Sequence, residues 1–207
     1  MGIYRERILP RLMEFVLGRP IFLEQRRVAL GQARGRALEI GFGFGASLPA
    51  YPDAGSTLTR LVAIDPNRGM NRRAARRTRS SPFPVDLLCG RAEALPMVDD
   101  TFDTVVTNWT LCSLPDPRAG LREIRRVLKP DGRFLFLEHG RAEDPRLARR
   151  QERLTPLQRL LAGGCRLDLP IDELIRDAGL RIASLERYEM PWGPRSLRQM
   201  YRGVALP

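Results

Sequence analysis

The stretch ALEIGFGFGASLPAYP, residues 37–52, decides the fold, because a short apolar run ends there in a glycine-rich loop. Such a run is typical of a buried strand, and glycines after it let backbone amides approach a ligand at the strand's carboxyl end. The loop reads G-x-G-x-G rather than the pyrophosphate-binding G-x-G-x-x-G, and Glu39 just before it would repel phosphate groups. Glu39 instead suits a ligand with a cationic end, such as an amino group. The alternative is a tight turn that binds nothing.

The rest of the chain alternates short apolar runs with helical or turn-rich segments. The segment 117–129 is the clearest helix, since its apolar residues share one face and a Pro-Asp-Gly turn follows. This alternation predicts an α/β fold in which helices cover both faces of a doubly wound, mostly parallel sheet. An amphipathic segment at 3–30, interrupted by Pro10, precedes the first strand, and a further helix is expected near 170–178. The predicted strands are 36–41, 60–65, 84–90, 102–108 and 133–138, with closing strands at 180–189 and 198–205.

The composition fits one ordinary globular domain, with 207 residues of which 43% are hydrophobic and 29% charged. The sequence has no run of about 18 uncharged apolar residues and no signal-peptide pattern, so we expect a cytoplasmic protein without a transmembrane helix. Cys89, Cys112 and Cys165 are widely spaced and form no C-x-x-C pair. This spacing indicates free thiols and predicts neither a disulfide framework nor a metal site.

The formal net charge of +11 comes almost entirely from arginine, since Lys129 is the only lysine. One explanation of this bias is a general preference for arginine over lysine. The densest group, six arginines within 68–79, is expected on the solvated face of a helix. A nucleic-acid or anionic-lipid partner stays open, although no aromatic residues interleave the group as binding of single strands favours.

A second acidic residue, Asp65, ends the next apolar run, 26 positions after Glu39. A carboxylate at the tip of a neighbouring parallel strand can accept both hydroxyls of a ribose. The alternative role for Asp65 is to cap the following helix. Ala92 and Glu93 follow the third run, where a small residue leaves room for a planar ring and Glu93 or a backbone amide can meet its polar edge. The three strand tips together predict a site for one nucleoside-like ligand.

The chain resembles the class I S-adenosylmethionine-dependent methyltransferases in four segments: LEIGFGFG (38–45), VAID (62–65), GRAEALPMVDDTFDTVV (90–106) and LREIRRVLKPDGRFLFLEHG (121–140). The resemblance covers about residues 36–140, and it is the combination of segments that is specific. Within this superfamily, TLCSLPDP (110–117), LEHG and the pair Gly164-Cys165 are similar to the branch of thiol S-methyltransferase-like proteins. Quinone and phosphatidylethanolamine methyltransferases share the more general motifs.

The resemblance implies S-adenosyl-L-methionine as cofactor and a Rossmann-like sheet of seven strands. It implies that the strand-tip glycines and Glu39 meet the methionine end, that Asp65 meets the ribose, and that Asn108 lies beside the methionine portion and faces the substrate. Arg91 stands where many relatives carry Asp, and a guanidinium cannot accept a hydrogen bond from the adenine amino group. Arg91 is expected either to stack on the adenine or to point outward. The implied cofactor-binding residues are Glu39, Gly41, Gly43, Gly45, Asp65, Pro66, Arg91, Ala92, Glu93 and Asn108.

We expect a single methyltransferase domain over residues 1–207. Residues 1–32 would form an N-terminal helical cap, 33–140 the cofactor-binding core, and 141–207 the substrate-side helices and closing strands. The cap and the stretch 141–170 are expected to close over the pocket and shield an apolar acceptor.

Methyl transfer is an in-line displacement, so the protein's main task is to hold donor and acceptor close and to exclude water. A base is needed only if the acceptor must lose a proton. His139, the sole histidine, follows the fifth predicted strand and is the candidate base, because imidazole takes up a proton near neutral pH. The alternative is a packed structural histidine. Trp109 and Trp192 are candidates for either a pocket wall or the core, and Cys112 is expected to pack rather than to act as a nucleophile.

The segment after the fourth strand, TNWTLCSLPD (107–116), lacks the Asn-Pro-Pro-Tyr type of signature that would support adenine or glutamine N-methylation. We therefore predict transfer to a small or lipophilic acceptor, with a thiol as one candidate. Alternatives are a phospholipid or quinone methyltransferase in peripheral contact with a membrane, and an RNA-modifying methyltransferase, although no stable nucleic-acid partner is expected. A protein that keeps the cofactor fold only as a binding or scaffolding module is a further alternative.

Overall fold

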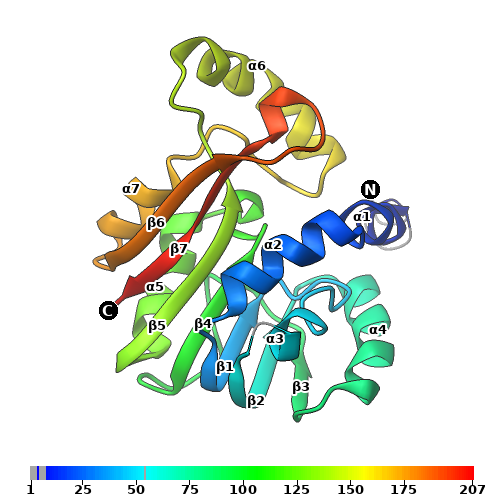
Figure 1. Cartoon of the computed structure of the whole chain (residues 1–207), viewed down its shortest axis with the longest axis vertical. Coiled ribbons are helices and arrows are strands. Elements are labelled where there is room, and N and C mark those ends of the chain that lie inside the picture. Colours follow the sequence, from blue (N-terminus) through cyan, green and yellow to red (C-terminus); the bar gives the residue numbers. More distant parts are fainter. Residues whose placement is uncertain (1–3, 5–7, 54) are drawn as a thin grey trace.

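The computed structural model describes residue 4, residues 8–53 and residues 55–207. One sheet contains seven strands: β1 (Arg34–Ile40), β2 (Thr57–Ile64), β3 (Val85–Leu88), β4 (Phe102–Asn108), β5 (Leu128–His139), β6 (Arg181–Glu189) and β7 (Gln199–Leu206). Their order across the sheet is β3-β2-β1-β4-β5-β7-β6 (Figure 1). The first five strands pair in parallel, and β7 is antiparallel to both β5 and β6. The predicted α/β fold with a doubly wound, mostly parallel Rossmann-like sheet is confirmed.

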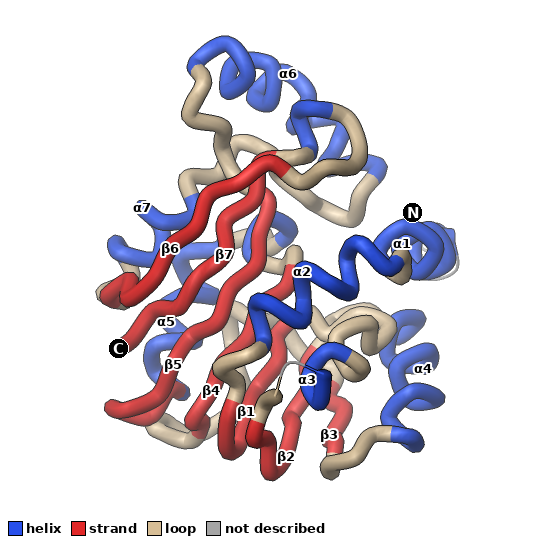
Figure 2. The backbone as a smooth tube through the Cα atoms, in the orientation of Figure 1, coloured by secondary structure: helices blue, strands red, loops and turns tan. Residues whose placement is uncertain are grey.

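Helices cover both faces of this sheet. They are α1 (Leu9–Leu17), α2 (Pro20–Leu30), α3 (Ala50–Asp53), α4 (Arg68–Arg77), α5 (Pro117–Val127), α6 (Pro145–Leu161) and α7 (Ile171–Asp177), with the short 3₁₀ turn η3 (Leu111–Ser113). Side chains of α5 and α7 pack into one face, whereas α2, α3 and α4 pack into the other. Helix α6 lies beyond the end at which the parallel strands finish, and α1 lies near the same end (Figures 1 and 2). Both helices therefore lie at the edge of the sheet where the parallel strands end.

The central strands read as continuous apolar runs because both faces of the sheet are buried. In β2, Val62 and Ile64 pack against the cluster under α5 and α7. Their neighbours Leu61 and Ala63 pack into the opposite cluster, under α2, α3 and α4. This burial on both sides holds the strand tips, and the polar residues that follow them, in fixed positions.

The N-terminal amphipathic segment forms the two helices α1 and α2, which are separated at Gly18 and Arg19. Pro10 lies in the first turn of α1, which begins at Leu9, and the backbone of Ile8 before it is also helical. The interruption at Pro10 stays a prediction. Of the predicted segment 3–30, residues 3 and 5–7 lie outside the described residues.

Helix α6 is fixed over the end of β5 by one buried side chain. Gln151 accepts a hydrogen bond from the Ala142 amide at 2.8 Å and donates to the Gly140 carbonyl at 3.1 Å. It also donates to the Ser196 carbonyl at 3.1 Å. A single glutamine thus ties the helix to the chain leaving β5 and to the segment before β7.

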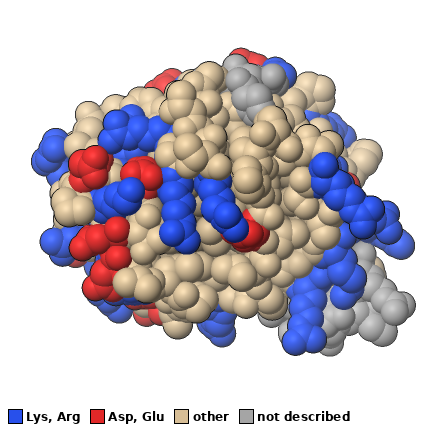
Figure 3. All heavy atoms as spheres, turned by 90° about the horizontal axis from the view of Figure 1, so that it is seen from below, with Lys and Arg blue, Asp and Glu red and all other residues tan. Residues whose placement is uncertain are grey.

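On the face in Figure 3, basic side chains lie in two regions, one shared with acidic side chains and one almost without them. Basic and acidic side chains are interleaved over part of the face in Figure 3, and large uncharged areas separate them. Two arginines of the group at 68–79, Arg73 and Arg77, form ion pairs with Glu14 of α1. Among the described residues, no helix has both the length and the apolar character needed to cross a membrane.

Candidate functional site

A cavity of about 610 Å³ opens at the carboxyl ends of the parallel strands. It is lined by the loop after β1, the segment after β2, the loop after β3 and the residues that follow β4. Nine of the ten predicted cofactor-binding residues are among those that line it: Glu39, Gly41, Gly43, Asp65, Pro66, Arg91, Ala92, Glu93 and Asn108. The tenth, Gly45, lies farther along the loop, against Phe42 and Leu48, and does not line the cavity.

Two glycines of the loop are required for different physical reasons. A Cβ atom at Gly41 would lie only 2.2 Å from Thr110 Oγ1, so only glycine allows this close approach. At Gly43 a Cβ atom would have space, since its nearest neighbour would be 3.9 Å away, but the φ angle of 59° lies in the left-handed region that favours glycine. The loop therefore presents its backbone directly to the cavity.

Glu39 is buried at the floor of the cavity and is held by neutral donors. Its Oε2 accepts hydrogen bonds from Ser47 Oγ at 2.7 Å and Tyr51 Oη at 2.8 Å, and its Oε1 accepts one from Asn108 Nδ2 at 3.2 Å. Burial raises the pKa of Glu39, although these hydrogen bonds and the charge of Arg26 oppose the shift. A carboxylate in such surroundings is ready to receive a cationic group.

Asp65 links the tip of β2 to the glycine loop. Its Oδ2 accepts a hydrogen bond from the Gly43 amide at 2.9 Å, and its Oδ1 accepts one from the Asn67 amide at 2.7 Å. Burial raises the pKa of Asp65. The cap of α4 is Asn67, whose side chain accepts from Gly69 and Met70, so the alternative role of Asp65 as the helix cap is wrong. Each carboxylate oxygen keeps a lone pair for a further donor in the cavity.

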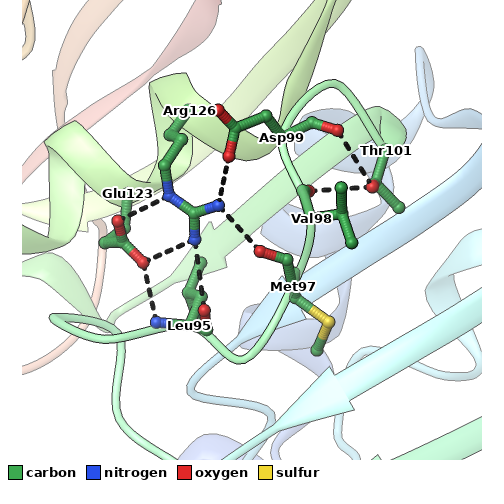
Figure 4. A network of polar contacts seen from close by, with 7 residues as sticks. All are labelled: Leu95, Met97, Val98, Asp99, Thr101, Glu123 and Arg126. Carbon is green, nitrogen blue, oxygen red and sulfur yellow. Dashed lines mark hydrogen bonds and ion pairs between the residues drawn. The ribbon is translucent and has the colours of Figure 1, made fainter.

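The loop after β3 is clamped onto α5. The guanidinium of Arg126 donates to both carboxylate oxygens of Glu123 at 2.8 Å and to Asp99 Oδ1 at 2.6 Å (Figure 4). It also donates to the carbonyls of Leu95 and Met97 at 3.1 and 2.7 Å. Such a bidentate, charge-assisted arrangement fixes the loop that begins with Arg91.

Within this loop the three predicted residues differ in surroundings. Ala92 is buried, whereas the side chain of Arg91 is 63% exposed and its Nε lies 3.5 Å from Glu93 Oε2. Glu93 Oε1 accepts a hydrogen bond from the Asp116 amide at 3.4 Å. Because Arg91 lines the cavity and is also largely exposed, both arrangements expected for it stay predictions.

The end of β4 leaves unpaired polar atoms beside the cavity. Asn108 Oδ1 and Trp109 Nε1 are buried, and neither has a hydrogen-bond partner within the described part of the chain. Trp109 also has a φ angle of 52°, which is uncommon for a bulky residue. Unsatisfied buried groups and backbone strain of this kind concentrate at ligand sites. The residues present therefore fit a polar ligand in this cavity.

A second, smaller cavity of about 130 Å³ lies next to the first and shares Trp109 with it. His139 lines this cavity, and its ring centroid lies 6.4 Å from that of Trp109. Trp192 lines it as well and packs edge-on against Phe22, with centroids 5.4 Å apart. Both tryptophans thus line an apolar pocket and also belong to the buried cluster around Phe22, so the two predicted alternatives hold together.

Two cysteines also border the small cavity. Cys112 and Cys165 are buried with their Sγ atoms 3.7 Å apart, and Cys165 Sγ lies 3.8 Å from His139 Nδ1. The contact with Cys112 and the nearby imidazole of His139 lower the pKa of the Cys165 thiol well below its usual range. The proximity of these three side chains does not follow from their spacing in the sequence.

Sequence reasoning missed one further charged residue. Arg26 of α2 lines the large cavity although it is buried, and its Cζ lies 4.8 Å from the centroid of the Trp109 ring. No sequence feature near Arg26 predicts a role in the site, since Arg26 is one of two adjacent arginines in an amphipathic helix. Only the packing of α2 over the sheet brings it to the strand tips.

Comparison with known proteins places this site in a family. Residues 38–136 match a family model described as a methyltransferase domain. The chain is 31% identical over 192 residues to the mitochondrial methyltransferase OMS1 of Saccharomyces cerevisiae, an alignment that covers 82% of this chain and 39% of that protein. It is 29% identical over 173 residues to human thiol S-methyltransferase TMT1A, covering 82% of this chain and 69% of that protein.

A demethylmenaquinone methyltransferase of Renibacterium salmoninarum is 35% identical over 111 residues, covering 53% of this chain and 44% of that protein. The chain thus spans between 39% and 69% of the length of these three relatives.

Solved structures share the fold. The putative methyltransferase solved in complex with the Trm112 methyltransferase activator of Haloferax volcanii has a TM-score of 0.74 at 19% identity, over 98% of this chain and 95% of that one. A methyltransferase of Thermotoga maritima has a TM-score of 0.69 at 22% identity, over 98% of both chains. The matched residues 38–136 contain the strand tips that line the large cavity, and we conclude that this part of the chain is a methyltransferase domain.

Proposed function

We propose that this protein transfers a methyl group from S-adenosylmethionine to a small-molecule acceptor, and that the acceptor is a thiol. The observation that carries the proposal is the position of Trp109, which lines both the cavity of about 610 Å³ that contains the buried charged groups and the apolar cavity of about 130 Å³. The larger cavity suits a nucleoside with a charged tail. The smaller one suits a compact apolar molecule, and because the two cavities adjoin at Trp109, ligands bound in them would lie next to each other.

In the larger cavity, the buried charges support one orientation of the cofactor. Glu39 would receive the amino group of the methionine end, and Arg26 would receive its carboxylate. Asp65 would accept the ribose hydroxyls, and Ala92 would leave room for the adenine. When bound, the cofactor supplies a methyl group already activated by the positive sulfur, so the protein has to hold and orient rather than to activate it.

On the acceptor side, the small cavity would exclude water from the transfer. Its lining includes aromatic, aliphatic and thioether side chains, and no acidic or basic residue other than His139 is among the described residues that line it. We propose that His139 accepts the proton of the acceptor thiol. An acceptor with a large polar portion would leave that portion unsatisfied in these surroundings.

The test is a panel of small thiols, phenols, quinones and phosphatidylethanolamine, with turnover read as release of S-adenosylhomocysteine. We expect turnover with thiols. His139→Ala should lower the single-turnover rate by about 100-fold for thiols of high pKa, and less as the acceptor pKa falls, since a positioned base contributes 10² to 10⁴. If the ratio of wild-type to variant rates is near one for every thiol, His139 is not the base. Absence of turnover with the whole panel, while cofactor binding is intact, would favour a binding module over an enzyme.

A lipophilic acceptor at a membrane surface is the second candidate, and one observation favours it. Large apolar side chains are exposed on α1 and on the end of α6, which both border the large cavity: Leu12, Phe15, Leu157, Leu160 and Leu161. The two segments touch, since a Cβ atom at Gly163 would lie 3.0 Å from Leu9 Cδ2. An exposed apolar rim around a cavity is typical of proteins that take substrate from a lipid surface.

Sedimentation with phosphatidylglycerol and phosphatidylcholine vesicles tests this second candidate. Binding that is lost when Leu157 and Leu160 are both changed to Ser would support it. If the protein stays in the supernatant with both kinds of vesicle, the membrane alternative is removed and the thiol proposal is unaffected.

A further inference from the structure

Three side chains that carry soft or borderline ligand atoms converge beside the acceptor cavity. Cys112 comes from η3, His139 is the last residue of β5, and Cys165 lies in the loop after α6. Their ligand atoms all lie within 4.8 Å of one another. The Arg166 amide donates to the Cys112 carbonyl at 2.7 Å, which fastens the two cysteine-bearing loops together. The backbone therefore holds these groups close without a covalent link.

The separations fit a tetrahedral ion better than a disulfide. With Zn–S and Zn–N bonds of about 2.3 and 2.0 Å, tetrahedral angles place two sulfurs about 3.8 Å apart and a sulfur and a nitrogen about 3.5 Å apart. The observed Sγ–Sγ distance is 3.7 Å and the Cys165 Sγ–His139 Nδ1 distance is 3.8 Å. A disulfide needs about 2.05 Å between the sulfurs, and both cysteines are free. The third pair, Cys112 Sγ and a ring nitrogen of His139, lies within 4.8 Å and would have to reach about 3.5 Å on binding.

The surroundings favour a soft divalent cation. Two thiolates would neutralise a charge of +2, and a neutral imidazole would complete three ligands without adding charge. The thioethers of Met13 and Met190 line the same cavity, whereas no carboxylate does among the described residues there. Hard cations such as Mg²⁺ and Ca²⁺ prefer carboxylate and carbonyl oxygens, so this donor set discriminates against them.

We propose that Cys112, His139 and Cys165 form a binding site for a thiophilic divalent cation such as Zn²⁺, whose fourth coordination position opens into the small cavity. Binding releases to solvent any protons that the two thiols still carry and leaves both sulfurs as thiolates. A closed structural site has four protein ligands, whereas three protein ligands and an open position are typical of a site that binds an exogenous molecule.

This inference goes beyond the proposed methyl transfer and has a consequence for it. A neutral imidazole has a single lone pair, so His139 cannot hold the cation and accept a proton at the same time. The form of the protein that uses His139 as a base is therefore the metal-free form.

The experiment uses the full chain, reduced and freed of metal, with Zn²⁺ as the probe and a colorimetric chelator as competitor. We expect one Zn²⁺ per chain. Cys112→Ser and Cys165→Ser should each weaken binding by more than about 100-fold, beyond the loss typical of an outer-shell partner. Cys89→Ser is the matched control, because Cys89 is the exposed third cysteine, and it should bind as the wild type does. Co²⁺ in place of Zn²⁺ should give thiolate-to-metal charge-transfer absorption in the wild type and in Cys89→Ser only.

A second measurement needs no variant and so does not depend on how the variants fold. Zn²⁺ should slow the alkylation of Cys112 and Cys165 in the wild type, mapped by mass spectrometry, and leave the alkylation of Cys89 unchanged. Unchanged alkylation of the buried pair, or Zn²⁺ affinity equal in all three cysteine variants, would overturn the proposal. Neither measurement involves cofactor or acceptor, so failure here leaves the methyl-transfer proposal standing.

Discussion

Arg26 lies over the face of Trp109, with its Cζ 4.8 Å from the ring centroid and its Nη1 donating to the Leu17 carbonyl at 2.8 Å. Burial lowers the pKa of Arg26 to about 10, so the guanidinium keeps its charge at neutral pH. Within the part of the chain that the structure describes, no acidic side chain forms an ion pair with it. A buried cation that lines a cavity in this way is positioned to receive an anionic group of a ligand.

The first prediction concerns the anion that Arg26 receives. Arg26→Gln should weaken the binding of S-adenosylhomocysteine by about tenfold, equivalent to about 1.4 kcal/mol. The binding of 5′-methylthioadenosine, which lacks the amino-acid portion, should change little, because that ligand has no carboxylate. Titration calorimetry with both ligands measures the difference, with Arg27→Gln as the control. An equal loss for the two ligands would mean that Arg26 only supports the fold of α2.

The second prediction is that a change at Asp65 weakens the binding of both ligands, since both carry a ribose. Asp65→Asn replaces an acceptor that serves the Gly43 and Asn67 amides with a group that is partly a donor. We expect both ligands to bind at least about tenfold more weakly, the loss typical of a hydrogen bond to a charged group. Asp86→Asn is the control, because Asp86 pairs with Arg60 on the surface. If S-adenosylhomocysteine binds the Asp65 variant as it binds the wild type, the ribose assignment is wrong.

The strand-tip residues could be predicted from sequence because each follows directly on a local pattern. Glu39 and Asp65 end continuous apolar runs, and the parallel sheet brings the ends of neighbouring runs together, so the order of the motifs was enough to predict the large cavity. The position of Gly45 was less predictable, because a G-x-G-x-G pattern does not tell which glycines face a ligand. The tilt of the loop after Gly43 depends on how Phe42 and Leu48 pack.

The acceptor side could not be predicted in the same way, since its residues come together only through long-range packing. Cys112 and Cys165 are 53 positions apart, and their contact depends on how α6 and the loop after it return to η3. Arg26 likewise depends on the path of α2 across the sheet. Periodicity and motif spacing describe local structure. They therefore carry no information about contacts between residues that are far apart in the sequence.

Asp172 provides a prediction about stability and pH. Its side chain is 5% exposed and accepts hydrogen bonds from Arg176 at 2.5 Å and Arg187 at 2.9 Å. Although burial acts in the other direction, the hydrogen bond from Arg176 and the charges of Arg187 and Arg176 lower the pKa of Asp172. The ionised form is therefore favoured in the folded state, and its contribution to stability is present above the unfolded pKa of about 4 and is lost as pH falls through the lower folded pKa.

Asp172→Asn should accordingly lower the free energy of unfolding at pH 7 by about 1 to 3 kcal/mol, the range for hydrogen bonds to charged groups. The gap to the wild type should narrow below about pH 4, where the wild-type carboxylate begins to lose its advantage. Urea unfolding followed by circular dichroism at a series of pH values measures both effects. Asp177→Asn removes an exposed pair with Arg118 and should cost less than about 0.5 kcal/mol at any pH. A gap that stays constant with pH would show that the loss arises from packing rather than from charge.

The last prediction separates the backbone role of Gly43 from general stability. Gly43 and Gly55 both have left-handed φ angles, 59° and 74°, and neither has a neighbour closer than 3.9 Å to a Cβ atom built on it. Changing either to Ala should therefore cost a similar amount of stability, about 1 to 2 kcal/mol, from backbone strain alone. Gly43 also lines the large cavity, and its amide donates a hydrogen bond to Asp65. Only Gly43→Ala should therefore weaken the binding of S-adenosylhomocysteine, by about tenfold or 1.4 kcal/mol.

Thermal unfolding of both variants gives the loss of stability, and calorimetry gives the change in ligand affinity. Equal weakening in the two variants would assign the effect to lost stability, and normal binding in both would show that this part of the loop does not contact the cofactor.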